Sequence, residues 1–400
     1  MPIPASVYDF GEDMALVYEW CVNRILLNIA RRFPYIEDED ARGVFEWQAK
    51  KLVEFGQCNE ETMKIIRDSL ENVPEELEKQ LEEQIVKAVE SIEPALAGAA
   101  KAGLLTGTPP ELSQSVKQSF SAFYRQAADK LNMVNTVMLD STQTAYMGVV
   151  NDVAQKIAQS QKILNAAAGS AVTGVETLNS ATRQAVERMI ANGLTGFVDH
   201  GGHKWRPEAY VMMDVRTTVC NAARQASFDR CEDYGSDIIQ VDAHAGARPL
   251  CYPWQGKLIS MKDFSRDVED IDGNKVHVYA LHETSYGEPA GLFGVNCRHF
   301  GTPFIPGFSG LMNPDLIQPK EENDERYALT QEQRGMERAL REARLREAAA
   351  KERGDKEAYD AAHAKVKELS DRIGDFCEAN GLPRRRDREY TPVKATWPLN

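Results

Sequence analysis

The sequence predicts a mostly helical α+β protein, and three observations support this fold class. Apolar residues recur at spacings of three and four near both ends of the chain, which is the period of helices packed on one side. Between these stretches, strand-like segments stand among shorter helical patterns. Part of this middle region is dense in glycine and proline, which favours loops. We therefore expect a helical section at 1–174, a small mixed α+β domain at 175–319 and a charged helical section at 320–400.

The composition fits a soluble chain with a real core, because 42% of the 400 residues are hydrophobic and 27% are charged. The net charge of −14 argues against a general nucleic-acid binder, which needs a cationic surface. The seven cysteines are scattered and odd in number, which favours a reducing compartment over a disulfide framework. We expect no secretory signal, and no apolar run reaches the roughly eighteen residues of a membrane-spanning helix.

The first section reads as a helical scaffold or docking region. Pro74 stands at a plausible first helical turn, ahead of apolar residues at helical spacing. A second such run follows at 116–134. Few His, Cys or Asp residues converge in this section, so we expect no chemistry there. The apolar positions of the first run are Leu77, Leu81, Ile85, Ala88 and Ile92.

The central section mixes helices and strands. We expect helices at 175–192 and from Pro207 to about Gly235, with a short hairpin turning at Gly201–Gly202 between them. Strand candidates follow at 237–241, 257–260 and 275–281, and the last alternates apolar and polar residues. The glycine- and proline-rich segment 286–314 is not expected to form regular structure.

The third section reads as a charged helical hairpin with a basic tail. Residues 326–353 carry Glu–Arg and Glu–Lys pairs four apart, Gly354 interrupts the pattern, and 359–376 carries an apolar heptad seam. The tail holds a small basic cluster at 384–388. Either this cluster is a solvated end or it contacts DNA or an acidic partner.

A metal site is one chemical reading of the central section. Two loops carry four nitrogen and sulfur ligands of the kind that zinc takes in a tetrahedron. The spacing His-x6-Cys and Cys-x-His is not that of a standard zinc knuckle. The candidate ligands of this structural zinc are His244, Cys251, Cys297 and His299.

Nucleophilic catalysis is a second reading, in which Cys251 or Cys297 attacks after a histidine deprotonates it. The histidine would be His244, His282 or His299, oriented by Asp242 or Glu283. No recognised hydrolase or phosphate-binding motif occurs in the chain. A metal-dependent or cysteine hydrolase, or an effector, stands as the alternative function.

A third reading is that these loops brace each other. Arginine can bind carbonyl or carboxylate groups through its planar fork, and a Trp-Gln pair can pin one loop on another. The loop residues would then form a buried polar network that gives an irregular region one shape. The residues of this network and of the sequence motifs are Trp205, Arg216, Arg248, Pro249, Trp254, Gln255, Gly256, Asn296, Arg298, Pro306 and Gly307.

These motifs resemble the phage minor capsid protein 2 family, which is similar in role to MuF-type head proteins. The resemblance covers roughly 175–353, and its most specific part combines Arg248-Pro249 and Gln255-Gly256 with the segment Asn-Cys-Arg-His at 296–299. The charged segment 331–338 also looks like the helix that follows in such proteins.

The resemblance implies a structural virion protein without catalytic activity. It would be made in the host cytoplasm and built into the head in several copies, inside the capsid near the portal. Its expected partners are the portal protein or the major capsid protein, with packaged DNA as a further contact through 384–388. Its expected role is to assist head assembly and DNA packaging or ejection.

Overall fold

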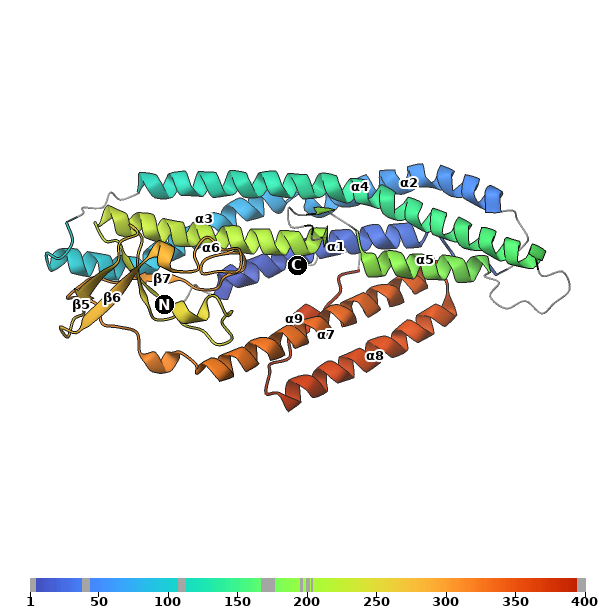
Figure 1. The fold of residues 1–400 in the computed structure, drawn as a ribbon. Coiled ribbons are helices and arrows are strands. Elements are labelled where there is room, and N and C mark those ends of the chain that lie inside the picture. Colours follow the sequence, from blue (N-terminus) through green and yellow to red (C-terminus); the bar gives the residue numbers. More distant parts are fainter. Residues whose placement is uncertain are drawn as a thin grey trace. The chain divides into compact units, whose positions relative to one another are not determined.

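The computed structural model of the chain describes residues 5–37, 44–106, 113–166, 177–194, 197–198, 202 and 204–393. Helices dominate, and a small five-stranded sheet forms from strands within residues 238–303 (Figure 1). The fold class predicted from the sequence, mostly helical α+β, is confirmed. The helices are α1 (Ala5–Ala30), α2 (Val44–Leu70), α3 (Val73–Lys101), α4 (Gln114–Ala166), α5 (Leu178–Asn192), α6 (Pro207–Asp233), α7 (Lys320–Arg353), α8 (Lys356–Ala379) and α9 (Arg386–Glu389).

The chain forms two compact units, and each takes several separate pieces of the sequence. Unit 1 consists of 1–14, 72–130 and 212–331, and unit 2 consists of 15–71, 131–211 and 332–400. The unit boundaries fall inside long helices such as α4 and α7. These unit boundaries do not coincide with residues 174 and 319. The division of the sequence into three sections stays a prediction about domains.

Unit 1 holds a five-stranded sheet in the order β5-β6-β4-β3-β7. All neighbouring strands are antiparallel except β4 and β6, which are parallel. Three strands lie within a residue or so of the predicted positions, whereas β5 and β7 were not predicted. The strands are β3 (Ile238–Val241), β4 (Leu258–Ser260), β5 (Arg266–Glu269), β6 (Lys275–Ala280) and β7 (Gly301–Pro303).

Strand β3 is buried along its whole length, and its two isoleucines lie in different apolar clusters. Ile238 lies in one apolar cluster with Leu258 and Phe304. Ile239 lies in another, which includes both Cys251 and Cys297. The second cluster ties the irregular segment before β7 to the sheet. The segment 286–314, expected to lack regular structure, consists mainly of turns and irregular backbone but also contains β7, and the short 3-10 helix η3 (Pro314–Leu316) begins at its end.

In unit 2, the expected short hairpin forms between β1 (Phe197–Val198) and β2 (Lys204–Trp205), which pair antiparallel. Gly202 of the predicted turn has a φ of 82°, a conformation that suits glycine. Gly201, the other residue of that turn, lies outside the described residues. The expected helical hairpin at the end of the chain forms as well. Gly354 separates α7 from α8 with a φ of 70°, and Leu340 packs against Ile373 between the two helices.

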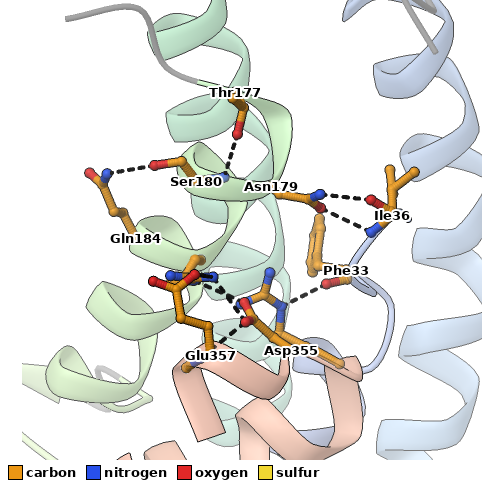
Figure 2. A network of polar contacts seen from close by, with 11 residues as sticks. Phe33, Ile36, Thr177, Asn179, Ser180, Gln184, Asp355 and Glu357 are labelled. Atoms are coloured by element: carbon orange, nitrogen blue, oxygen red, sulfur yellow. Dashed lines mark hydrogen bonds and ion pairs between the residues drawn. The ribbon is translucent and has the colours of Figure 1, made fainter. Parts of the chain in front are cut away.

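A polar network also stabilises unit 2 (Figure 2). The Asn179 side chain exchanges two hydrogen bonds with the main chain of Ile36, at 2.8 and 2.9 Å. Arg183 binds both carboxylate oxygens of Asp355, at 2.9 and 3.0 Å, and also contacts Glu357. These contacts connect α5 to the start of α8 and to the segment after α1.

Among the described helices, none has a stretch long and apolar enough to cross a membrane.

Candidate functional site

Two loops of unit 1 meet at one end of the sheet and carry the predicted metal ligands. The loop 242–257 leaves β3, and the loop 291–300 enters β7. Because β3 and β7 are antiparallel neighbours, the end of one lies beside the start of the other, with Val241 opposite Gly301. The sheet topology therefore joins loops that lie about fifty residues apart in the sequence. The residues brought together are His244, Cys251, Cys297 and His299.

Three of these side chains form a compact buried cluster. The Sγ atoms of Cys251 and Cys297 lie 3.9 Å apart, and Cys297 Sγ lies 3.5 Å from His299 Nδ1. All three ligand atoms lie within 4.8 Å of one another. The side chains are only 1 to 2% exposed, so solvent does not reach them. Both cysteines are free thiols.

His244 lies at the edge of this cluster, with its ring centroid 4.3 Å from that of His299. Burial, and next the neighbouring His299, lower the pKa of His244 to about 4. His244 is therefore neutral near pH 7, which is the form that binds metals. The Nε2 atoms of both rings are buried without a hydrogen-bond partner, which is unusual for polar atoms inside a protein.

The two thiols are electrostatically unequal. The contact between them lowers the pKa of Cys297 and raises that of Cys251, because a proton on Cys251 stabilises a thiolate on Cys297. The hydrogen bond with His299 lowers the pKa of Cys297 further. In addition, the main-chain N–H of Phe293 donates to Cys297 Sγ at 3.1 Å. The site thus favours a thiolate at Cys297.

Arg248 joins the two loops, and Gln255 fixes the first loop internally. Arg248 donates to the carbonyl oxygens of Val295 at 2.7 Å and Gly291 at 3.3 Å. These hydrogen bonds connect the first loop to the second. Gln255 is 3% exposed, and its side-chain oxygen accepts from the main-chain N–H of His244 at 2.7 Å. Arg248 thus binds carbonyl groups across the loops as its residue type suggested, whereas Gln255 contacts its own loop and not the second one.

Trp254 and Gly256, on either side of Gln255, fix the end of the first loop. Trp254, in the 3-10 helix η1 (Tyr252–Trp254), packs edge-on against Tyr279 of β6 at 5.6 Å. Gly256 has a φ of 75°, and its N–H donates to Val241 O at 2.9 Å. A Cβ on Gly256 would stand 3.0 Å from the end of the Ile317 side chain, so the position favours glycine mainly through its positive φ.

Two buried residues that sequence reasoning missed hold the loops from outside. Arg224 of α6 is 2% exposed and donates to the carbonyl oxygens of His299 at 3.0 Å and Phe293 at 3.3 Å. Asn323 of α7 is fully buried and exchanges two hydrogen bonds with the main chain of Ala247, at 2.7 and 2.9 Å. The sequence signal for Arg224 is its spacing, because it follows Cys220 by four residues and Thr217 by seven, on one face of the helix predicted from Pro207.

The remaining motif residues are not all at this site. Arg216 is buried on α6, and Asn296, with a φ of 56°, donates its N–H to Thr217 Oγ1 at 3.1 Å. Trp205 belongs to unit 2, where it packs edge-on against Tyr210. The other motif residues are exposed on turns, and these are Pro249, Arg298, Pro306 and Gly307.

The catalytic reading has little support in this arrangement. His282, in the 3-10 helix η2 (Leu281–Glu283), is exposed and pairs with Asp263 at 2.9 Å. The Glu283 carboxylate accepts from its own turn, at Ala280 N, and the Asp242 carboxylate accepts from Phe300 N at 2.9 Å. The thiols themselves are buried, so a substrate has no path to them in this conformation.

Comparisons with known proteins identify the family. The family model described as "Phage minor capsid protein 2" matches residues 4–378. A "Structural protein" of Lactococcus phage LL-H is 25% identical over 365 residues, which are 90% of this chain and 92% of that protein. No solved structure matches the chain significantly. Since the family match spans nearly the whole chain, the protein belongs to the phage minor capsid protein 2 family, and it is a structural protein of a phage virion.

Proposed function

We propose that this protein sits inside the phage head at the portal vertex and is present there in several copies. It would contact the portal protein or the inner face of the major capsid shell. Through these contacts it would assist head assembly and the packaging or ejection of DNA. The protein would be made in the host cytoplasm and enter the head during assembly.

The extent of the family match carries this proposal. Residues 4–378 include nearly all of both compact units. Neither unit is therefore left over as a separate catalytic or toxin module. The relative's match over 92% of its own length points the same way. We accordingly propose a structural role and no enzymatic activity.

Mass spectrometry of purified virions and DNA-free proheads tests the proposal. We expect the protein in both particles, at a small fraction of the copy number of the major capsid protein. Cross-linking in the particles should join it to the portal protein. Its absence from both particles would overturn the structural role. A copy number equal to that of the major capsid protein would overturn the portal location.

A contact with packaged DNA through the basic cluster 384–388 does not form part of the proposal. Arg384 binds Glu389 at 2.6 Å and Arg385 binds Asp387 at 3.0 Å, so nearby carboxylates neutralise two of the four arginines. The favoured partners are therefore proteins of the head.

A further inference from the structure

We propose that unit 1 binds one zinc ion through Cys251, Cys297 and His299, with His244 as the fourth ligand. The ion would be structural and would join the loop after β3 to the loop before β7. No comparison assigns a metal to this chain, and the inference does not depend on the location of the protein in the head.

The distances between the ligand atoms fit a tetrahedral zinc site. With Zn–S bonds of about 2.3 Å and Zn–N bonds of about 2.05 Å, two sulfurs stand roughly 3.8 Å apart and a sulfur and a nitrogen roughly 3.6 Å apart. The corresponding distances here are 3.9 Å between the two Sγ atoms and 3.5 Å from Cys297 Sγ to His299 Nδ1. The third pair, Cys251 and His299, has its ligand atoms within 4.8 Å of each other, so a small inward shift on metal binding would complete three corners of a tetrahedron.

His244 is the side chain best placed for the fourth corner. Its ring lies against that of His299, and its Nε2 is buried without a hydrogen-bond partner. As the fourth ligand, His244 would turn this nitrogen toward the three other ligands. Its main-chain N–H donates to Gln255 Oε1 at 2.7 Å, which holds the residue beside the cluster.

The surroundings suit bound thiolates. Phe293 N–H points at Cys297 Sγ, and Arg248 Nη2 approaches Cys251 Sγ at 3.8 Å. Donors of this kind orient and stabilise metal-bound sulfur. Two thiolates and two neutral imidazoles also balance the charge of Zn²⁺, so the buried centre would carry no net charge. This ligand set and geometry select zinc over harder cations such as magnesium or calcium.

A bound zinc ion would stabilise the two ligand loops, because they contain little regular secondary structure. Between the end of β3 and the start of β7, both ligand loops consist largely of turns and a short 3-10 helix. Loops of this type have little regular hydrogen bonding to hold them, and a structural metal contributes its binding free energy directly to folding.

Metal analysis of the full chain, purified under reducing conditions without chelators, tests the proposal. We expect one zinc per chain, and no zinc in the double variant Cys251→Ser/Cys297→Ser. The matched control is Cys231→Ser, which changes another buried thiol of unit 1 and should leave the zinc in place.

Cobalt substitution covers the case in which the double variant misfolds. Metal-free wild-type protein titrated with Co²⁺ should develop the visible absorption of a tetrahedral site and the near-ultraviolet charge-transfer band of thiolate ligands. His244→Ala should bind zinc more weakly in competition with a chelating dye. Unchanged affinity of that variant would overturn the assignment of the fourth ligand. A wild-type protein that holds no zinc and gives no such cobalt spectrum, or a thiol count that shows a Cys251–Cys297 disulfide, would overturn the site.

Discussion

Arg224 shows how one buried cation can determine the shape of a loop. It lies on α6, and its guanidinium donates to main-chain carbonyls of the loop that carries Cys297 and His299. It also lies 5.1 Å from the centre of the Phe293 ring. A planar fork with several donors can serve several carbonyl oxygens at once, which a lysine ammonium does less well.

We therefore expect Arg224→Met to lower the free energy of unfolding by about 3 kcal/mol, because buried carbonyl oxygens lose their donors. Urea denaturation of the variant and the wild type measures this. The neighbouring Gln225, which is exposed and contacts Asp229 on its own helix, provides the control. Equal losses in Arg224→Met and Gln225→Met would contradict the role of Arg224.

Glu19 should make stability depend on pH. Burial, with a contribution from Glu208, raises its pKa to about 7, although Arg341 at 3.2 Å and Arg206 oppose the rise. In the unfolded chain a glutamate titrates near about 4.3. The folded state thus holds this proton more tightly between these two values. The stabilisation is complete below the lower value and is lost as the pH rises through about 7.

We expect the wild-type free energy of unfolding to fall between about pH 5 and pH 8 through Glu19, by on the order of 1 kcal/mol after screening by solvent. Glu19→Gln is neutral at both pH values and should show a smaller fall. Chemical denaturation at the two pH values measures the difference. Glu357→Gln, at a side chain that is 83% exposed, should behave as the wild type does, and an unaltered pH dependence in Glu19→Gln would refute the prediction.

At the scale of elements, the start of α8 combines a helix cap with an ion pair. Asp355 is 1% exposed, accepts from Ala358 N as the N-cap of α8, and binds the Arg183 fork (Figure 2). Glu357 binds the same arginine but is almost fully exposed. Both carboxylates contact Arg183, but Asp355 is also buried, caps the helix and lies 3.7 Å from Arg353.

Asp355→Ala should lower the free energy of unfolding by about 3 to 5 kcal/mol, since it removes the cap and leaves part of Arg183 without its buried partner. Glu357→Ala should cost under about 1 kcal/mol, as is usual for an exposed ion pair. Thermal unfolding of both variants measures the contrast. Similar losses would show that the cap and the burial of Asp355 contribute little.

Regular elements could be predicted where one local pattern decides them. The apolar period of α3 and the glycine between α7 and α8 are local signals. Helix α3 and the break at Gly354 both lie where the sequence predicts them. β7 was missed because a three-residue strand in a glycine-rich segment depends on pairing with β3, far away in the sequence. Charge pairs were only partly predictable. Glu342 binds Arg346 as its spacing suggested, but Glu347 contacts His363 of the next helix.

The candidate site was predictable in its residue types and not in its arrangement. Histidines and cysteines on glycine-rich loops drew attention to His244, Cys251, Cys297 and His299. Their spacing matches no standard zinc motif, because the ligands converge through the antiparallel pairing of β3 with β7. The division into two units could not be read from the sequence either. Both units take pieces of the same long helices, such as α4 and α7, so the unit boundary coincides with no helix end there.

For the whole molecule, the net charge of −14 opposes binding to the phosphate backbone of DNA. The one basic cluster is partly neutralised by Asp387 and Glu389. We therefore expect no saturable binding of the full chain to a fluorescent DNA duplex at about 0.15 M salt, where weak phosphate contacts are screened. The double variant Arg386→Ala/Arg388→Ala should give the same anisotropy curve as the wild type. Saturable binding that falls steeply with salt and is lost in this variant would instead make the cluster 384–388 a DNA contact, and the protein would then bridge the shell and its packaged genome.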